Sequence, residues 1–256
     1  MEFESKVIII TGASSGIGAA TAIRFAKLGG LLTLVGRNLE KLNETAAKCL
    51  GAKGEHPLVV KADITNEEDV RQIVEQTLSK YSRIDVLINN AGIIENGSIE
   101  DTSLEQYDRV METNVRSLYQ LTMLAVPHLI EKKGNIVNLS SVCGLRSFPG
   151  VLAYNMSKSA VDQFKKCVAL ELAPKGVRVN SVNPGVIVTE LHKRGGMDEE
   201  TYKNFLEKCK QTHALQRPGN VDEVAAAITF LASDSASFIT GVNLPVDGGR
   251  HAMCPR

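Results

Sequence analysis

The stretch TGASSGIG, residues 11–18, directly follows the apolar run VIII at residues 7–10. A short run of β-branched residues is typical of a buried strand. Gly12, Gly16 and Gly18 then come within eight residues, although glycine weakens the interior of a helix or strand. A glycine-rich turn between a strand and a helix permits close backbone approach, and the start of the helix attracts phosphate. The stretch therefore favours a nucleotide site.

Short apolar runs recur along the whole chain and alternate with longer stretches of helical spacing. This alternation predicts a parallel α/β sheet with helices on both faces. Right-handed crossovers restrict the topology to a doubly wound, Rossmann-like sheet of about seven strands. The predicted strands are residues 7–10, 31–35, 58–60, 84–88, 135–139, 177–182 and 241–246. The clearest predicted helices are residues 18–28, 66–81 and 221–233.

A single dinucleotide-binding domain over residues 1–256 is the simplest interpretation, because no repeat or linker-like change of composition divides the chain. One less regular excursion, residues 189–216, separates two predicted sheet segments. Long excursions in compact domains often form a lid or a substrate-binding loop, and a peripheral helical insertion is the alternative. The sequence leaves both interpretations open.

Composition excludes several classes of function. Twenty-nine basic residues balance 29 acidic ones, which gives no general attraction to nucleic acid or to an anionic membrane. The five cysteines lack the spacing of a metal finger, and the five histidines form no cluster, so we expect no metal and no disulfide framework. No apolar run reaches the length of a membrane span, and no secretory signal is visible. We therefore expect a cytoplasmic protein.

Five ordered motifs resemble those of the short-chain dehydrogenase/reductase family. They are the glycine turn with its leading Thr11, NNAG at residues 89–92, Asn114 in TNV, Ser141 thirteen residues before Tyr154 of YNMSK, and Pro184-Gly185 in NPGVIVTEL. The resemblance extends over residues 6–249. It implies an oxidoreductase that transfers hydride between a nicotinamide cofactor and a carbonyl or secondary alcohol.

The same resemblance implies a role for individual residues of this chain. The catalytic residues it implies are Ser141, Tyr154, Lys158 and Asn114. The cofactor-binding residues it implies are Thr11, Gly12, Ser14, Ser15, Gly16, Ile17, Gly18, Arg37, Asp63, Asn90, Ala91, Gly92, Tyr154, Lys158, Pro184, Gly185, Ile187 and Thr189. Family relatives with this layout often form tetramers, so we also expect a homo-oligomer.

The residue types of the catalytic set fit acid–base chemistry. Tyr154 and Lys158 are four residues apart, so on a helix they share one face. A free tyrosine has a pKa near 10, and we expect the neighbouring ammonium to lower it. Tyr154 then exchanges a proton with the substrate oxygen, which Ser141 also binds. Ser140 competes with Ser141 for this role, and the family spacing selects Ser141. By resemblance, Asn114 supports a water and proton relay to Lys158.

The end of the second predicted strand predicts which cofactor is preferred. Gly36 stands where family members that prefer NAD carry an acidic residue for the ribose hydroxyls, and Arg37 follows it. A guanidinium suits a phosphate by its charge and its forked donors, so we expect NADP(H) to be preferred over NAD(H). A solvated charge at a strand end is the alternative for Arg37. By resemblance, Asp63 contacts the adenine, and it also suits the start of a helix.

The sequence specifies the substrate less closely than the cofactor. The apolar segment over residues 142–151 predicts an apolar pocket wall for a small carbonyl or alcohol substrate. Within it, Arg146 meets either a substrate carboxylate or solvent. A 3-oxoacyl reductase acting on acyl carrier protein or CoA thioesters is the main rival within the family. A non-catalytic NADP-binding regulator or scaffold is the rival of another class, and the intact set of Ser141, Tyr154 and Lys158 argues against it.

Overall fold

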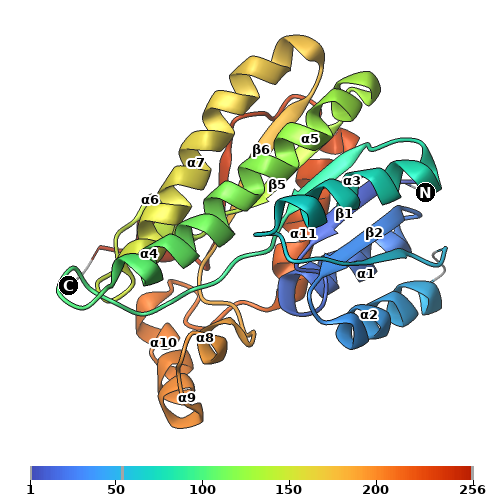
Figure 1. Ribbon diagram of the computed structural model, residues 1–256. Coiled ribbons are helices and arrows are strands. Elements are labelled where there is room, and N and C mark those ends of the chain that lie inside the picture. The colour runs from blue at the N-terminus through green and yellow to red at the C-terminus, as the bar shows by residue number, and fades with distance from the viewer. Residues whose placement is uncertain (1, 53–54, 255–256) are drawn as a thin grey trace.

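The computed structural model describes residues 2–52 and 55–254, and one parallel sheet of seven strands lies at its centre. The strand order is β3-β2-β1-β4-β5-β6-β7 (Figure 1). The strands are β1 (Val7–Thr11), β2 (Leu31–Gly36), β3 (Leu58–Lys61), β4 (Val86–Asn89), β5 (Asn135–Leu139), β6 (Arg178–Pro184) and β7 (Asn243–Val246). Each predicted apolar run overlaps one of these strands, which confirms the doubly wound parallel sheet.

Helices connect the strands and cover the sheet. The longer ones are α1 (Gly16–Lys27), α2 (Leu39–Gly51), α3 (Glu67–Tyr81), α4 (Leu104–Met111), α5 (Ser117–Lys132), α7 (Leu152–Leu172), α9 (Glu199–Glu207) and α11 (Val221–Ala232). The short ones are α6 (Val142–Leu145), α8 (Leu191–Arg194) and α10 (Cys209–Thr212). A π-helix, η1 (Glu112–Arg116), precedes α5, and the 3₁₀ turns are η2 (Ala173–Lys175), η3 (Asp234–Ala236) and η4 (Arg250–Ala252).

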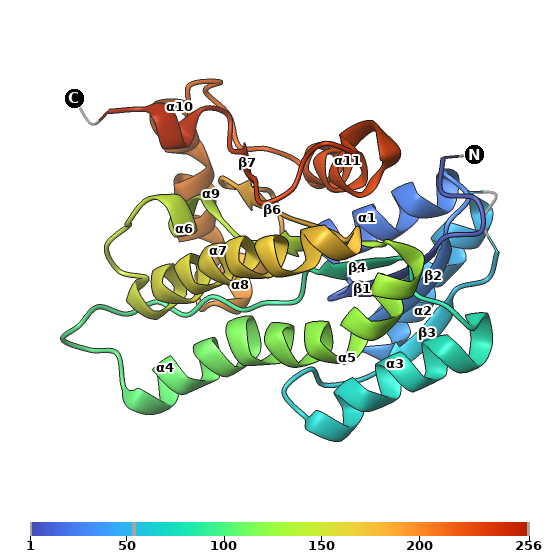
Figure 2. The same ribbon diagram turned by 90° about the horizontal axis from the view of Figure 1, so that it is seen from above.

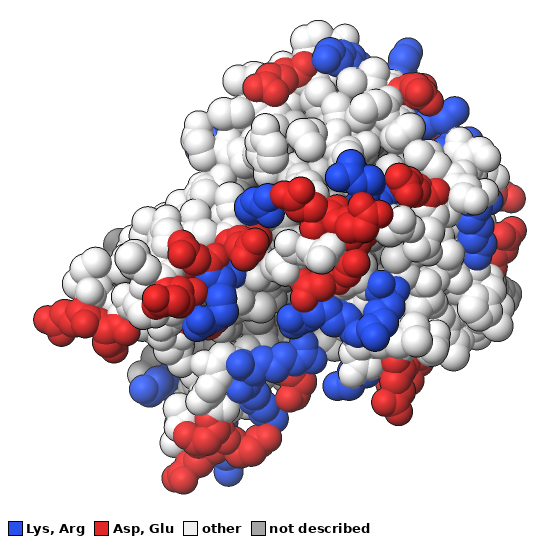
Figure 3. Space-filling view, viewed as in Figure 1, with Lys and Arg blue, Asp and Glu red and all other residues white. Residues whose placement is uncertain are grey.

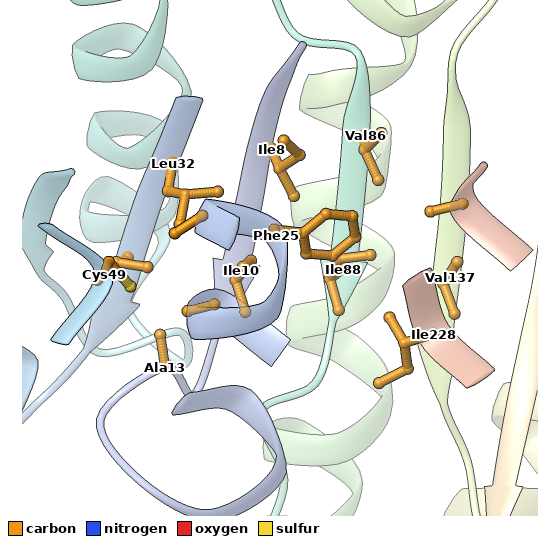
Figure 4. Packing of buried hydrophobic residues seen from close by; sticks show 14 of the residues in the cluster. Ile8, Ile10, Ala13, Phe25, Leu32, Cys49, Val86, Ile88, Val137 and Ile228 are labelled. Carbon is orange, nitrogen blue, oxygen red and sulfur yellow. The ribbon is translucent and has the colours of Figure 1, made fainter. Parts of the chain in front are cut away.

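Alternation along the strands divides the core into two layers. Ile8 and Ile10 of β1 pack with α1, α2 and α11, whereas Ile9 between them packs with α3, α5 and α7 on the opposite face. Figure 2 shows α1 and α11 on one side of the sheet and α3 and α5 on the other. Phe25 of α1 is fully buried over β1 and β4, close to Ile88 (Figure 4). Burial of each such side chain contributes about 1.5–3 kcal/mol.

The topology reverses direction beside β1, and this reversal creates the crevice that holds the site. β1 pairs with β2 on one side and with β4 on the other, so the loops that follow β1 and β4 diverge. Ligands of open parallel sheets bind at such a switch point, beyond the carboxyl ends of the strands. Residues 11–18 follow β1 and residues 89–92 follow β4, so the topology brings these two motifs to the same crevice.

The surface matches the balanced charge of the sequence. On the face seen in Figure 3, acidic and basic side chains are interspersed over most elements. Within the described residues, no helix combines the length and apolar character needed to cross a bilayer. In the same part of the chain, no three His, Cys, Asp or Glu side chains gather as metal ligands would.

Candidate active site

The glycine turn is shaped by contacts that leave no room for side chains. Gly12 has a φ of +66°, in the left-handed region that favours glycine. A Cβ on Gly18 would overlap the carbonyl oxygen of Gly12 and lie 2.5 Å from Asn90 Nδ2. The turn after β1 is thus packed directly against the loop after β4. This contact explains the third glycine of the motif.

Thr11 joins the end of β1 to the loop after β4 by hydrogen bonds. Its Oγ1 accepts hydrogen bonds from the backbone N–H groups of Asn90 (2.9 Å) and Ala91 (3.0 Å). Asn90 Nδ2 in turn donates to the carbonyl oxygen of Thr11 at 2.7 Å. Thr11 is buried and does not line the cavity described below. The structure therefore gives Thr11 a positioning contact rather than the surface contact expected of a cofactor ligand.

Helix α1 begins without the groups that usually satisfy a helix start. Its N-cap, Ser15, makes no side-chain cap hydrogen bond, and no acidic residue lies in the first turn. Helix α3 differs, because Asn66 caps it and three acidic residues fill its first turn. The free N–H groups and positive dipole end of α1 therefore favour an anion at this place.

A cavity of about 520 Å³ lies at the carboxyl edge of the sheet, within the range of cofactor and ligand sites. Most of the predicted site residues line it. They are Gly12, Ser14, Ser15, Gly16, Ile17, Gly18, Arg37, Asp63, Asn90, Ala91, Gly92, Ser141, Tyr154, Lys158, Pro184, Gly185, Ile187 and Thr189. Only Thr11 and Asn114 of the predicted set lie behind this lining.

Helix α7 supplies the central pair of the cavity. Tyr154 and Lys158 lie one turn apart and are both buried. Lys158 Nζ lies 5.6 Å from the centre of the Tyr154 ring and donates a 2.8 Å hydrogen bond to the carbonyl oxygen of Leu139. Ser141, at the end of the loop after β5, hydrogen-bonds Tyr154. The three residues that the sequence predicts to act together therefore meet in one place.

Burial dominates the acid–base properties of this pair. Removal from water raises the pKa of Tyr154, Cys143 raises it further, and the hydrogen bond with Ser141 lowers it. Burial also lowers the pKa of Lys158 to about 8. The expectation that Lys158 lowers the Tyr154 pKa is wrong for this structure. Desolvation is the largest influence on the phenol, and the Lys158 ammonium donates to the Leu139 carbonyl instead.

The structure separates the two neighbouring serines. Ser141 Oγ accepts from the backbone N–H of Cys143 at 3.1 Å beside Tyr154, whereas Ser140 Oγ donates to the carbonyl oxygen of Lys158 at 3.2 Å. Ser140 also hydrogen-bonds Asp162, a buried carboxylate whose pKa is raised by burial. Both serines line the cavity, and Ser141 is the one whose hydroxyl lies beside Tyr154.

Asn114 lies in the π-helix η1, and its side chain holds the loop after β4. Its Oδ1 accepts from the backbone N–H of Ile93 at 2.8 Å, and its Nδ2 donates to the Ile93 carbonyl and to Ser157 Oγ. A Cβ on Gly92 would lie 3.1 Å from Asn114 Oδ1 and 3.5 Å from Lys158 Nζ. Asn114 and Lys158 therefore converge on Gly92. Single π-turns occur frequently at functional sites.

Arg37 and Asp63 form the opposite end of the cavity. Arg37 Nη1 lies 3.9 Å from Asp63 Oδ2, and the Arg37 side chain is 73% exposed. Burial raises the pKa of Asp63, but the hydrogen bonds from Thr65 and the charge of Arg37 outweigh it, so the net pKa is lowered. The backbone of Gly36 lies against Ser14: a Cβ on Gly36 would lie 3.4 Å from Ser14 Oγ. Arg37 is thus an exposed cation beside the glycine turn.

The excursion over residues 189–216 forms a wall of the cavity, a placement that its sequence left open. Leu191 and His192 of α8, Met197 of the loop between α8 and α9, and Phe205 of α9 line the cavity. Tyr202 Oη holds the base of the excursion by donating to the Thr189 carbonyl at 3.0 Å. Figure 1 shows α8, α9 and α10 grouped beside the ends of the strands.

Two arginines in the cavity have no recognisable signal in the sequence. Arg194, at the end of α8, donates a 3.1 Å hydrogen bond to Ser15 Oγ across 179 positions of sequence. Arg250 of η4 lines the cavity near Cys143 and Phe148. Arg146, by contrast, is exposed and donates to the carbonyl oxygen of Met253 at 3.2 Å, outside the cavity lining. Of the two placements that the sequence allowed for Arg146, the surface placement is the one observed.

The chain matches known proteins over nearly its whole length. A family model described as enoyl-(acyl carrier protein) reductase matches residues 12–251. The meso-2,3-butanediol dehydrogenase of Serratia marcescens is 38% identical over 252 residues, which cover 98% of this chain and 97% of that protein. The chain belongs to the short-chain dehydrogenase/reductase family. It is therefore an oxidoreductase of the kind that acts on CH–OH or C=O groups.

Solved structures of the family share this fold. A short-chain dehydrogenase/reductase of unknown function from Caenorhabditis elegans, with cofactor, superimposes with a TM-score of 0.94 at 35% identity, covering 99% of this chain and 98% of that one. A 3-ketoacyl-(acyl-carrier-protein) reductase from Brucella melitensis, complexed with NADH, has a TM-score of 0.89 at 37% identity, with coverages of 97% and 99%. A nicotinamide cofactor is thus the cofactor of the family.

Proposed function

We propose that the protein is an NADP(H)-dependent oxidoreductase that transfers hydride between the cofactor and a carbonyl or secondary alcohol, with Tyr154 as the general acid and base. One observation carries this proposal. The side chains of Ser141, Tyr154 and Lys158 line the same cavity as the glycine turn and Arg37. A cofactor bound in this cavity could therefore exchange hydride with the carbonyl carbon of a substrate while Tyr154 exchanges a proton with the oxygen of the same carbonyl.

The residues present fit a dinucleotide. The backbone of the turn from Gly12 to Gly18 and the uncapped start of α1 suit the phosphates. Arg194, through its contact with Ser15, adds positive charge at the same place. Asp63 suits the adenine end, and the exposed fork of Arg37 suits a ribose phosphate. The hydride comes from the bound cofactor, whereas orientation and the proton come from the protein.

The chemistry of the protein centres on one proton. In reduction, Tyr154 Oη donates its proton to the substrate oxygen as that oxygen gains charge, and the Ser141 hydroxyl donates a hydrogen bond to the same atom. The raised pKa of Tyr154 keeps the phenol protonated at neutral pH, which is the form that carbonyl reduction requires. Lys158 supplies positive charge beside the phenolate that forms, and Asn114 fixes the loop that faces Lys158.

A 3-oxoacyl reductase is the second candidate. The Brucella melitensis relative, a 3-ketoacyl-(acyl-carrier-protein) reductase, supports it. That activity uses the same catalytic residues and differs in the substrate, a thioester of acyl carrier protein or CoA. A non-catalytic regulator is less well supported, because all three residues that would carry the chemistry are present and adjacent.

We also propose that the protein forms a homo-oligomer, with a tetramer as the expected state. The cytoplasmic location stays a prediction. Tyr119 and Met123 of α5 and Leu170 of α7 are large apolar side chains exposed to solvent. Tyr119 contacts Phe164 of α7, with ring centres 5.8 Å apart, so the two helices lie side by side. A second copy would cover these side chains, and light scattering of the purified protein measures the mass directly.

Oxidation of NADPH and of NADH by the purified protein tests the proposed function. The substrates are a panel of ketones, aldehydes, diketones and 3-oxoacyl thioesters, and equilibrium binding of both cofactors is measured in parallel. Turnover with NADPH at a higher kcat/KM than with NADH is expected. Turnover confined to thioesters would favour the 3-oxoacyl reductase. Tight NADPH binding with no turnover of any substrate would favour the regulator.

A further inference from the structure

The charges that line the cavity are distributed unequally. Its basic side chains are Arg37, Lys158, Arg194 and Arg250, with His192 beside them. Among the described residues that line it, Asp63 is the single acidic one, and it lies 3.9 Å from Arg37 at the adenine end. The end that contains Tyr154 is therefore lined by cations without a carboxylate.

Three of these cations have contacts that explain their position. Arg37 lies beside Asp63, Lys158 donates to the Leu139 carbonyl, and Arg194 donates to Ser15. Arg250 differs from them. Within residues 2–52 and 55–254, its guanidinium forms no salt bridge and donates no hydrogen bond to protein. Its close partner is the ring of Phe148, whose centre lies 4.4 Å from the guanidinium carbon.

Local backbone geometry places Arg250 in the cavity. Gly248 and Gly249, directly before it, have φ values of +57° and +79°, which other residues rarely adopt. A Cβ on Gly249 would lie 2.9 Å from the Cβ of Ala214, so the turn packs tightly on the end of the excursion. Leu215 fixes the same turn by donating its backbone N–H to the Gly248 carbonyl at 3.0 Å. This turn holds Arg250, the next residue, in the wall of the cavity.

The nearest acidic residue in the chain is already engaged. Asp247 accepts hydrogen bonds from the backbone N–H groups of Gly249 (3.0 Å) and His251 (2.6 Å), and it pairs with His251 Nδ1 at 3.0 Å. Its charge reaches Arg250 only at longer range. Arg250 is partly buried, and burial lowers its pKa. A desolvated cation without a hydrogen-bonded anion is costly, which favours a ligand that supplies the anion.

Arg250 lies on the same side of the cavity as the catalytic residues. Burial raises the pKa of Cys143, and the charges of both Arg250 and Lys158 act to lower it. Cys143 therefore lies within range of the arginine and of the catalytic lysine. Apolar side chains also line the cavity, and Phe148 among them packs against Arg250: Ile94, Phe148, Val151, Leu191, Met197 and Phe205. A ligand that reaches from Tyr154 to Arg250 crosses an apolar stretch and ends at a cation.

We propose that Arg250 binds a carboxylate of the substrate, so that the physiological substrate is an oxo acid, or the matching hydroxy acid, with an apolar segment between its two polar ends. The forked donors of arginine match the two oxygens of a carboxylate. This inference rests on the proposed reductase function and refines the substrate class of the same site. It assigns to Arg250 the role that the sequence left open for Arg146.

Paired probes test this inference. The probes are acetoacetate, levulinate and longer-chain oxo acids, each with its methyl ester, which keeps the ketone and removes the charge. Equilibrium binding by calorimetry and kcat/KM with NADPH are measured on the wild-type protein, Arg250→Met, Arg250→Lys and Arg146→Met. Arg146→Met is the matched control, since that arginine lies near the same terminus but outside the cavity.

We expect the wild-type protein to prefer an acid over its ester. Arg250→Met is expected to weaken binding and kcat/KM for the acid about tenfold to hundredfold and to leave the ester nearly unchanged, because hydrogen bonds to charged groups have this magnitude. Arg250→Lys keeps part of the preference, and Arg146→Met keeps all of it. Unimpaired turnover of the ester also shows that the variant is folded.

Two results would overturn the inference. One is equal binding of acids and esters by the wild-type protein, and the other is an equal loss of both in Arg250→Met, which would reduce Arg250 to a packing partner of Phe148. The proposed function fails in a different way. Acid binding that depends on Arg250, without oxidation of either cofactor, would support the carboxylate site and contradict the reductase.

Discussion

Lys158 Nζ lies 5.6 Å from the centre of the Tyr154 ring, and burial shifts the pKa values of the two groups in opposite directions. The pKa of the phenol is raised, and that of the ammonium is lowered to about 8. The Tyr154 phenol is therefore protonated at neutral pH without help from its neighbour. In the proposed mechanism, the contribution of Lys158 is instead its charge, which it loses first as the pH rises.

This order of titration predicts the pH profile of ketone reduction. Above a pH of about 8, Lys158 becomes neutral while Tyr154 keeps its proton, so the phenolate formed during transfer loses a stabilising charge. We expect kcat/KM for reduction to decline above that pH. Lys158→Arg, which keeps the charge, should move the decline to higher pH. A wild-type profile that stays flat to a pH of about 10, the ordinary pKa of tyrosine, would contradict this role when chemistry limits the rate.

Replacement of Arg37 tests the cofactor preference. Arg37→Ala is expected to weaken NADPH binding about tenfold to hundredfold, because a hydrogen bond from a cation to a phosphate is lost. NADH, which lacks that phosphate, should bind nearly as before. Arg71→Ala serves as the control, since Arg71 is an exposed arginine of α3 paired with Glu68 outside the cavity. Equal losses of both cofactors would show that Arg37 does not read the phosphate.

Replacement of Gly18 tests the packing of the glycine turn. In Gly18→Ala the added Cβ would lie 2.3 Å from the carbonyl oxygen of Gly12, within the turn, and 2.5 Å from Asn90 Nδ2, so the turn itself must change shape. Overpacking of this kind costs about 1–3 kcal/mol, and we expect NADPH and NADH to lose affinity together by about tenfold or more. In Gly51→Ala the added Cβ meets nothing within 4 Å, so this control should bind as the wild-type protein does. Unchanged cofactor affinity in Gly18→Ala would refute the account of the turn.

The fold was largely predictable because its signals are local. The run VIII at residues 7–10 is apolar on both faces, and in the structure Ile8 and Ile9 do bury themselves in opposite layers. Asn66, the first residue of the predicted helix over 66–81, caps α3 and accepts from the N–H groups of Glu68 and Asp69. Patterns of this kind depend on residues that are near one another in the sequence, so they can be recognised without knowledge of the tertiary structure.

The site was predictable only where a family motif marks it. Tyr154, Lys158 and Ser141 were identified from their spacing, and the cavity brings them together. Arg194 and Arg250 carry no such spacing, because their positions depend on how a long excursion folds back over the sheet. The pKa of Tyr154 was expected with the wrong sign, since burial depends on all the elements that surround the ring. Contacts across more than a hundred residues leave no pattern in a single sequence.

The measurement that tests the central claim most directly is NADPH-dependent reduction of the best ketone by Tyr154→Phe, with NADPH affinity measured on the same sample. The substitution keeps the ring and removes the proton donor. We expect the rate to fall about 10²–10⁴-fold while NADPH still binds, because general acid catalysis has this magnitude. A variant that binds NADPH and reduces the ketone at the wild-type rate would contradict the assignment of Tyr154 as the acid.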